Sequence, residues 1–118
     1  MDDGRVWAFE ESLWTATPEH YQESIDETCL MVVPAPPYVL GDQQAIDAVK
    51  QTPRWQEVRF SDQRVTRPQE GLICVAYKVE ASSGDGPGYT AYCTSVYRRL
   101  GHDNWKVVQH QQTPPLTH

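Results

Sequence analysis

The sequence has no long hydrophobic run and few basic residues. Its longest apolar stretch, from Cys29 to Pro34, has about six residues, whereas a transmembrane helix needs ~20. The 10 lysines and arginines are outnumbered by 16 aspartates and glutamates, which gives a net charge of −6. This acidity argues against a nucleic-acid partner and against a membrane surface as partner. The first residues contain neither the basic nor the apolar segment of a secretory signal, so we expect a cytoplasmic protein.

Cysteine and histidine are also scarce, and their spacing does not suit a metal site. Cys29, Cys74 and Cys93 are odd in number, have no CxxC spacing and lie inside apolar runs, which predicts buried, reduced thiols. None has the basic neighbour or helix N-terminus that would activate a nucleophile. The four histidines share no ligand spacing with one another or with the cysteines. We therefore expect no metal and no cofactor.

The chain has the size and composition of one globular domain, residues 1–118, with 39% hydrophobic residues, four tryptophans and six tyrosines. In its first half, apolar residues at spacings of three and four predict an amphipathic helix. The hydrophobic face of this helix consists of Val6, Phe9, Leu13 and Ala16. Glu10–Ser12 is assigned to its solvent-exposed side. Thr17-Pro18 favours the start of a second, short helix. That helix carries Tyr21, Ile25 and Thr28 on one face.

Short strands and another helix follow the two helices. Residues 29–33 form a strand-like run that ends in a proline-rich segment, and residues 38–40 suit a second short strand. A third helix is predicted to begin at Gly41-Asp42, with Asp42 as its cap, and to end at Thr52-Pro53.

The second half of the chain is rich in β-branched and aromatic residues and predicts strands at residues 55–65, 72–80, 89–99 and 105–113. The last three are joined by hairpin-length turns, the first of which is the Gly- and Ser-rich segment 81–88. Such strands pair as an antiparallel meander. Helices followed by strands indicate the α+β class, with N-terminal helices packed on one face of a curved sheet.

Several local stretches, together spanning almost the whole chain, carry a family resemblance. They are Gly41–Ile46, Trp55, Ile73–Tyr77, Ser95–Arg99 and Trp105–Pro114, of which the last is the most specific. With the order of elements, they make the chain resemble the nuclear transport factor 2-like superfamily, also called SnoaL-like or cystatin-like, and its small bacterial members of unknown function in particular. A more distant likeness is to the association domain of calcium/calmodulin-dependent kinase II.

The resemblance implies a cone with a strongly bent antiparallel or mixed sheet, an internal pocket between sheet and helices, and homodimers packed through the outer sheet face. It does not imply one activity, because the superfamily includes isomerases, dehydratases, epoxide hydrolases, cyclases, transport factors and oligomerisation hubs.

Alternation along the strands, in the register that the resemblance supplies, assigns the two faces of the sheet. The inward residues are predicted to be Ile73, Val75, Tyr77, Val79, Ala91, Cys93, Ser95, Tyr97, Val108, His110 and Gln112. The outward set includes Tyr92, Val96, Trp105 and Val107, which we expect to form the dimer interface. A single β-bulge would reverse the assignment beyond it.

The predicted pocket combines aromatic walls with a few polar groups, as small-molecule sites do. Its candidate lining residues are Trp14, Tyr21, Trp55, Tyr77, Ser95, Tyr97, His110 and Gln112. His110 is the one that titrates near neutral pH. It is therefore the candidate general base, with Tyr77 or Tyr97 donating to the resulting oxyanion. The same residues also fit a purely structural reading as core and hydrogen-bonded side chains.

Acidic residues are absent from the predicted inward sheet positions. Asp62, which shares parity with Val58 and Phe60, is the best acidic candidate. Where the resemblance implies pocket arginines, as in the kinase association domain, this chain has uncharged residues. We therefore expect a near-neutral cavity and an uncharged, partly apolar ligand.

Three functions remain open at this point. The first is a domain that binds a small molecule of unassigned identity. The second is an isomerase-, dehydratase- or cyclase-type enzyme that uses His110 as general base. The third is an oligomerisation module with a vestigial pocket.

Overall fold

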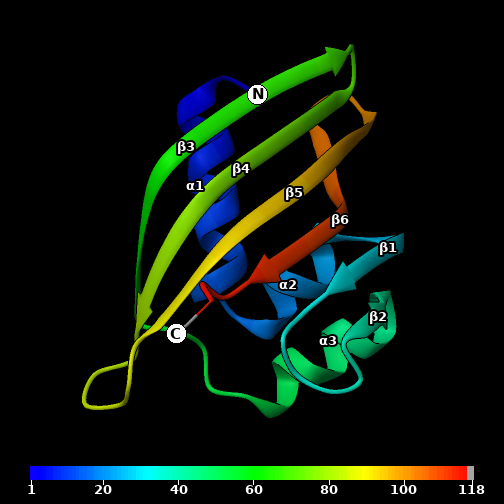
Figure 1. Ribbon diagram of the computed structural model, residues 1–118. Coiled ribbons are helices and arrows are strands. Elements are labelled where there is room, and N and C mark those ends of the chain that lie inside the picture. The colour runs from blue at the N-terminus through cyan, green and yellow to red at the C-terminus, as the bar shows by residue number, and fades with distance from the viewer. Residues whose placement is uncertain (117–118) are drawn as a thin grey trace.

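The computed structural model describes residues 1–116, in which three helices cover one face of a six-stranded, strongly curved sheet (Figure 1). The helices are α1 (Asp3–Thr15), α2 (Pro18–Ser24) and α3 (Asp42–Gln51). The strands are β1 (Ile25–Val32), β2 (Val39–Gly41), β3 (Glu57–Gln69), β4 (Leu72–Ser82), β5 (Tyr89–Gly101) and β6 (Asn104–Thr113). Their order in the sheet is β2-β1-β6-β5-β4-β3. Only β1 and β6 pair in parallel, so the predicted α+β fold with a mixed sheet is confirmed.

Helix ends follow the local capping signals. Asp2 caps α1 by accepting a hydrogen bond from the Arg5 backbone N–H (2.9 Å), and Thr17 caps α2 ahead of Pro18. The cap of α3 is Gly41 rather than Asp42 as predicted, and its backbone N–H donates to the Gln44 side chain at 2.9 Å. Within residues 1–116, no helix has both the length and the apolar composition to cross a bilayer.

The second helix is shorter than predicted, because the chain becomes extended at Ile25. The prediction of helix as far as Thr28 and strand from Cys29 is wrong. Ile25 already pairs with Val107 of β6, and the two side chains are buried together in the core. Packing of this end of β1 against β6 thus outweighs its helical spacing.

A β-bulge in β6 reverses part of the predicted face assignment. Val96 pairs with Gln109, and the next residue of β5, Tyr97, pairs with Val107. Val108 is the extra residue, so the parity of β6 changes there. Val107 is fully buried inside, and Trp105 lies on the helix side, where it borders a shallow concavity with residues of α1. The predicted outward positions of Val107 and Trp105 and the inward position of Val108 are therefore wrong.

A second bulge, in β3, removes Asp62 from the interior. The pairing with β4 shifts between Ser61 and Arg64, and Asp62 has a left-handed backbone with φ of 52°, which aspartate tolerates better than most residues. Its side chain is exposed. The prediction of Asp62 as the acidic group of the pocket is wrong.

Two of the three free cysteines are buried as predicted. Burial raises the pKa of Cys29 and of Cys93 to about 12, so both are protonated, unreactive thiols at neutral pH. Cys74 is half-buried, on the outward parity of β4 between Thr66 and Val96.

An ion pair between the buried Asp26 and the more exposed Arg98 ties β1 to β5. Asp26 is 2% exposed and accepts two hydrogen bonds from Arg98, at 2.8 and 3.1 Å, and two from Thr28. These contacts lie in the stretch where the pairing of β1 with β6 is irregular. The hydrogen bonds from Arg98 hold the pKa of Asp26 at about 2, against an ordinary value of 3.8.

This lowered pKa predicts a specific dependence of stability on acid. Because the folded pKa lies below the unfolded one, Asp26 stabilises the fold above about pH 4, and that contribution is lost as the pH falls towards 2. In Asp26→Asn, the urea midpoint should fall less steeply between pH 4 and pH 2 than in the unaltered protein. Asp85→Asn, on the exposed β4–β5 loop, is the control and should keep the original slope. Equal slopes in all three proteins would contradict the assignment.

Candidate functional site

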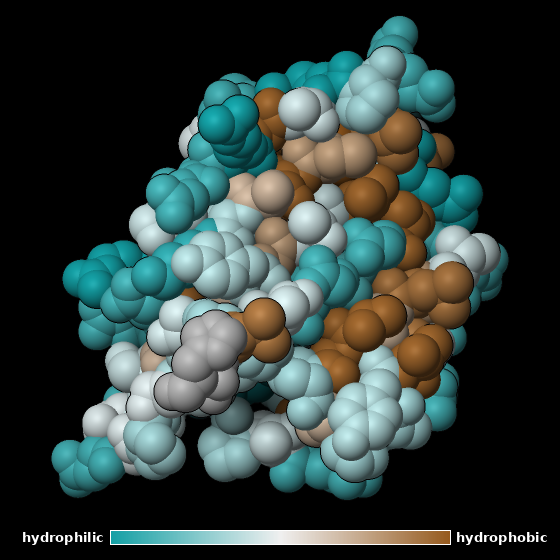
Figure 2. Space-filling view, in the orientation of Figure 1, coloured by the Kyte–Doolittle hydropathy of each residue, from teal (hydrophilic) through white to brown (hydrophobic). Residues whose placement is uncertain are grey.

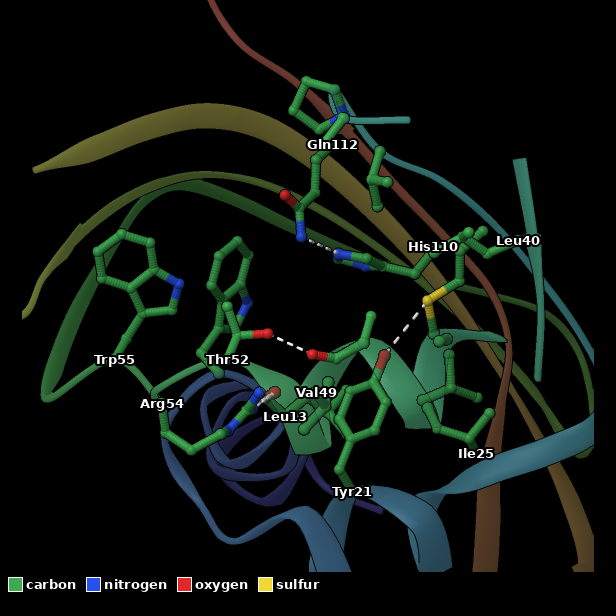
Figure 3. A pocket seen from close by; sticks show the side chains of 18 of the residues that line it. Leu13, Tyr21, Ile25, Leu40, Val49, Thr52, Arg54, Trp55, His110 and Gln112 are labelled. Atoms are coloured by element: carbon green, nitrogen blue, oxygen red, sulfur yellow. Dashed lines mark hydrogen bonds between the residues drawn. The ribbon is translucent and has the colours of Figure 1, made fainter. Parts of the chain in front are cut away.

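A cavity of about 390 Å³ lies between the helices and the concave side of the sheet (Figure 3). Its walls are mostly apolar and come from the end of α1, from α2 and α3, from β1, β2, β5 and β6, and from the segments after β1 and after α3. The apolar walls include Leu13, Trp14, Ile25, Met31, Leu40, Val49 and Trp55. Polar side chains are fewer and come from Tyr21, Thr52, Arg54, Tyr89, His110 and Gln112.

Behind the polar wall of this cavity lies a fully buried carboxylate, that of Glu10. It accepts hydrogen bonds from three hydroxyls of the sheet: Tyr77 at 2.5 Å, Ser95 at 2.7 Å, and Tyr97. Trp14 Nε1 donates to the Tyr77 hydroxyl at 3.0 Å. A buried carboxylate with this number of donors is compensated for the loss of its hydration.

Ser95 connects the carboxylate to His110. The Ser95 hydroxyl hydrogen is directed at Glu10, so the 2.7 Å contact between Ser95 Oγ and His110 Nδ1 requires the imidazole to donate from Nδ1. His110 Nδ1 is itself 3.7 Å from the Glu10 carboxylate. The hydrogen-bond pattern thus assigns the Nδ1–H tautomer and leaves the lone pair on Nε2.

The other side of the imidazole is held by Gln112. The Tyr89 hydroxyl donates to Gln112 Oε1 at 2.9 Å, which orients the amide nitrogen towards His110 Nε2 at 3.1 Å. Every donor in the series Tyr89, Gln112, His110 and Ser95 therefore points the same way, towards Glu10. Burial lowers the pKa of His110, and the Glu10 carboxylate opposes that shift, so the neutral base form is favoured.

The predicted site residues divide into two layers. Trp14, Tyr21, Trp55, His110 and Gln112 line the cavity. Tyr77, Ser95 and Tyr97 do not line it but lie behind it, with their hydroxyl hydrogens directed at Glu10. The tyrosine hydroxyls are therefore not placed to stabilise an oxyanion in the cavity. Burial and the nearby Glu10 raise the pKa of both tyrosines.

Sequence reasoning missed Glu10 and Arg54. Glu10 was assigned to solvent, yet it lies four residues after Val6 and four before Trp14, on the buried stripe of α1. This spacing from Val6 and Trp14 is a sequence signal that places Glu10 on the buried side of the helix. Arg54 lies in the irregular segment between α3 and β3, where no periodicity indicates which way a side chain points.

The charged groups of the site do not resemble a metal centre. Within residues 1–116, no group of three or more histidine, cysteine, aspartate or glutamate side chains is arranged to hold a metal ion. The arrangement instead offers an apolar cavity with a hydrogen-bonded imidazole at one wall, and it can bind a compact molecule or exchange a proton with one.

No protein-family model and no curated protein matches this sequence. Solved structures match closely in fold. A ketosteroid isomerase-like protein from Parabacteroides distasonis has a TM-score of 0.82 at 19% identity, covering 98% of this chain and 89% of that one. A nuclear transport factor 2-like protein from Cytophaga hutchinsonii has a TM-score of 0.77 at 20% identity, covering 98% and 100%.

A calcium/calmodulin-dependent kinase II hub homology domain from Chlamydomonas reinhardtii is also similar. Its TM-score is 0.75 at 15% identity, with coverage of 98% of this chain and 100% of that one. At sequence identities this low, the structural similarity shows the fold of the chain but not its activity, which has to be argued from the site. The helices, the mixed sheet and these matches together show that the chain has the nuclear transport factor 2-like fold.

Proposed function

We propose that this protein binds a small, largely apolar molecule in the cavity between its helices and its sheet. The observation that supports this most directly is the cavity itself, about 390 Å³ in volume and walled by apolar and aromatic side chains. Small-molecule sites have volumes of roughly 300–1,000 Å³ and combine apolar walls with a few placed polar groups. Here His110 and Gln112 are such polar groups, and their orientation is fixed by hydrogen bonds.

A second candidate function, proton transfer, is favoured by the series of hydrogen bonds behind His110. A general base needs a free lone pair, a fixed tautomer and stabilisation of its charged form. Nε2 carries the lone pair, which becomes available once a ligand takes over the hydrogen bond from the Gln112 amide. Ser95 fixes the tautomer, and Glu10 at 3.7 Å is placed to stabilise an imidazolium. Such a site would abstract a proton from an acidic C–H of a bound neutral substrate. This corresponds to the isomerase, dehydratase or cyclase class.

A purely oligomeric role is the weakest of the three functions considered. A vestigial pocket would be filled by side chains, whereas this cavity is large enough for a ligand. Assembly remains compatible with ligand binding, however, and we propose that the protein forms a homodimer through the outer face of the sheet.

The outer face has the composition of a self-complementary interface. Leu30, Val32 and Val39 are 61%, 46% and 62% exposed. Figure 2 shows hydrophobic side chains gathered on the side of this face formed by β1 and β2. In the register of the sheet, Leu30 lies beside Gln109, and Val32 lies between Val39 and Gln111. This part of the outer face carries no charged side chain among the five residues named, and such a patch can pack against its own copy about a two-fold axis.

Filling the cavity tests the binding function. Ala45 is buried and lines the cavity, so Ala45→Phe should occupy the space and abolish binding of neutral aromatic amides such as 3-phenylpropanamide, measured by calorimetry. Ala8→Phe is the matched control, since Ala8 is exposed and lies outside this cavity, and it should bind as the unaltered protein does. The proposal fails if neither this amide nor the matching acid binds at millimolar concentration, or if Ala45→Phe binds as well as the control.

Isotope exchange tests proton transfer. In D₂O, the protein should exchange the α-hydrogens of a neutral ketone such as 4-phenyl-2-butanone, followed by proton NMR. His110→Gln should slow this exchange by about 10²–10⁴-fold, the usual loss with a general base. If His110 is only structural, no enzyme-dependent exchange should occur. In that case His110→Ala should cost about 1–3 kcal/mol of unfolding free energy, because Ser95 and Gln112 lose their partner.

The dimer is tested by placing a charge on the outer face. Val32→Glu brings like charges together across a two-fold interface, so sedimentation equilibrium at micromolar concentration should change from dimer to monomer. Ala8→Glu adds the same charge on the exposed side of α1, away from the outer face of the sheet, and should remain dimeric. A monomeric unaltered protein would refute the proposal.

A further inference from the structure

The cavity contains one cation that neither proposed function yet uses, Arg54. It lies in the segment between α3 and β3, and its guanidinium reaches the end of α1. Nε donates to the Ala16 carbonyl at 2.8 Å, and Nη2 donates to the Leu13 carbonyl. The guanidinium carbon is 5.4 Å from the centre of the Tyr21 ring. These contacts fix the position of the charge at the cavity wall.

The positive charge of Arg54 is not neutralised by the protein. No carboxylate within residues 1–116 forms a salt bridge with it, and burial lowers the pKa of Arg54 with only Tyr21 opposing that shift. The carbonyls at the end of α1 supply a partial negative charge of about one half. A guanidinium has five N–H groups, and two donate to these carbonyls, which leaves three for a ligand.

The position of Arg54 gives the cavity two polar ends. Figure 3 shows Arg54 on one side of the cavity and His110 with Gln112 on the other, with apolar side chains between them. No carboxylate lines the cavity among the described residues. A bound anion would therefore meet no acidic side chain at the wall, and it would supply the countercharge that Arg54 lacks.

We propose that the ligand is a compact apolar monocarboxylate, whose carboxylate pairs with Arg54 and whose hydrocarbon body fills the aromatic cavity. This inference rests on the proposed binding function and specifies its ligand class. An arginine with free N–H groups recognises a carboxylate through paired, charge-assisted hydrogen bonds. The expectation of an uncharged ligand is based on the inward strand positions alone, where arginines are absent, whereas Arg54 lies in the segment before β3.

A matched pair of probes tests the inference. 3-Phenylpropanoate and 3-phenylpropanamide have the same body and differ in charge, and their dissociation constants are measured by calorimetry at pH 7.5. The unaltered protein should bind the acid about tenfold or more tightly than the amide. Arg54→Met should abolish this preference by weakening the acid while leaving the amide within about twofold. Arg54→Lys should retain part of the preference, because it keeps the charge without the planar pair of donors.

The controls separate the possible outcomes. Arg59→Met removes an exposed arginine that pairs with Glu80 outside this cavity and should keep the full preference for the acid. Because Arg54 also holds the end of α1, retained amide binding in Arg54→Met shows that the cavity is still formed. Equal binding of acid and amide by the unaltered protein would overturn the inference and leave the binding function standing. A preference that persists in Arg54→Met would overturn the role of Arg54. Failure of both probes to bind would overturn the binding function itself.

Discussion

The buried carboxylate of Glu10 is the interaction on which the rest of the site depends. A carboxylate removed from water is costly unless donors replace its hydration, and here the donors are Tyr77, Ser95 and Tyr97. These hydroxyls come from two neighbouring strands and meet on one residue of α1, so they fix where the helix lies on the sheet. They also fix the direction of the Ser95 hydroxyl, and through it the tautomer of His110. The hydrogen bonds that hold α1 on the sheet therefore also fix the tautomer of His110.

Sequence alternation predicted the inward faces of β4 and β5 correctly, and there is a physical reason why it did not extend further. From Leu72 to Ala81 every residue of β4 pairs with β5 without interruption, so a period of two holds throughout. In β3 and β6 the pairing shifts by bulges. A bulge is set by the partner strand and by sheet curvature, neither of which is visible in the strand itself. Asp62, Trp105 and Val107 were misplaced for this reason, whereas His110, beyond the bulge, kept its predicted side.

Glu10 and Arg54, two charged residues of the site, were not predicted from the sequence, for different reasons. Glu10 had a helical spacing that agrees with Val6 and Trp14, but a glutamate is usually solvated, and only its hydroxyl partners on distant strands make burial favourable. Those partners are more than 60 residues away in the chain. Arg54 follows Pro53 in irregular backbone and has no periodic context. The fold could therefore be predicted from the order of its elements, whereas the electrostatics of the site depended on long-range contacts.

The geometry of His110 also indicates how binding and proton transfer are related in this cavity. The Gln112 amide donates to the lone pair on His110 Nε2, so this nitrogen is already engaged in a hydrogen bond. A ligand with an acceptor at this end could take the Gln112 N–H and release Nε2, because the amide needs an acceptor wherever it turns. Glu10 would then stabilise the imidazolium from behind, while Arg54 would stabilise negative charge on the ligand from the opposite side. Proton transfer in this cavity would thus require the bound ligand first, so the proposed proton transfer depends on the proposed ligand binding.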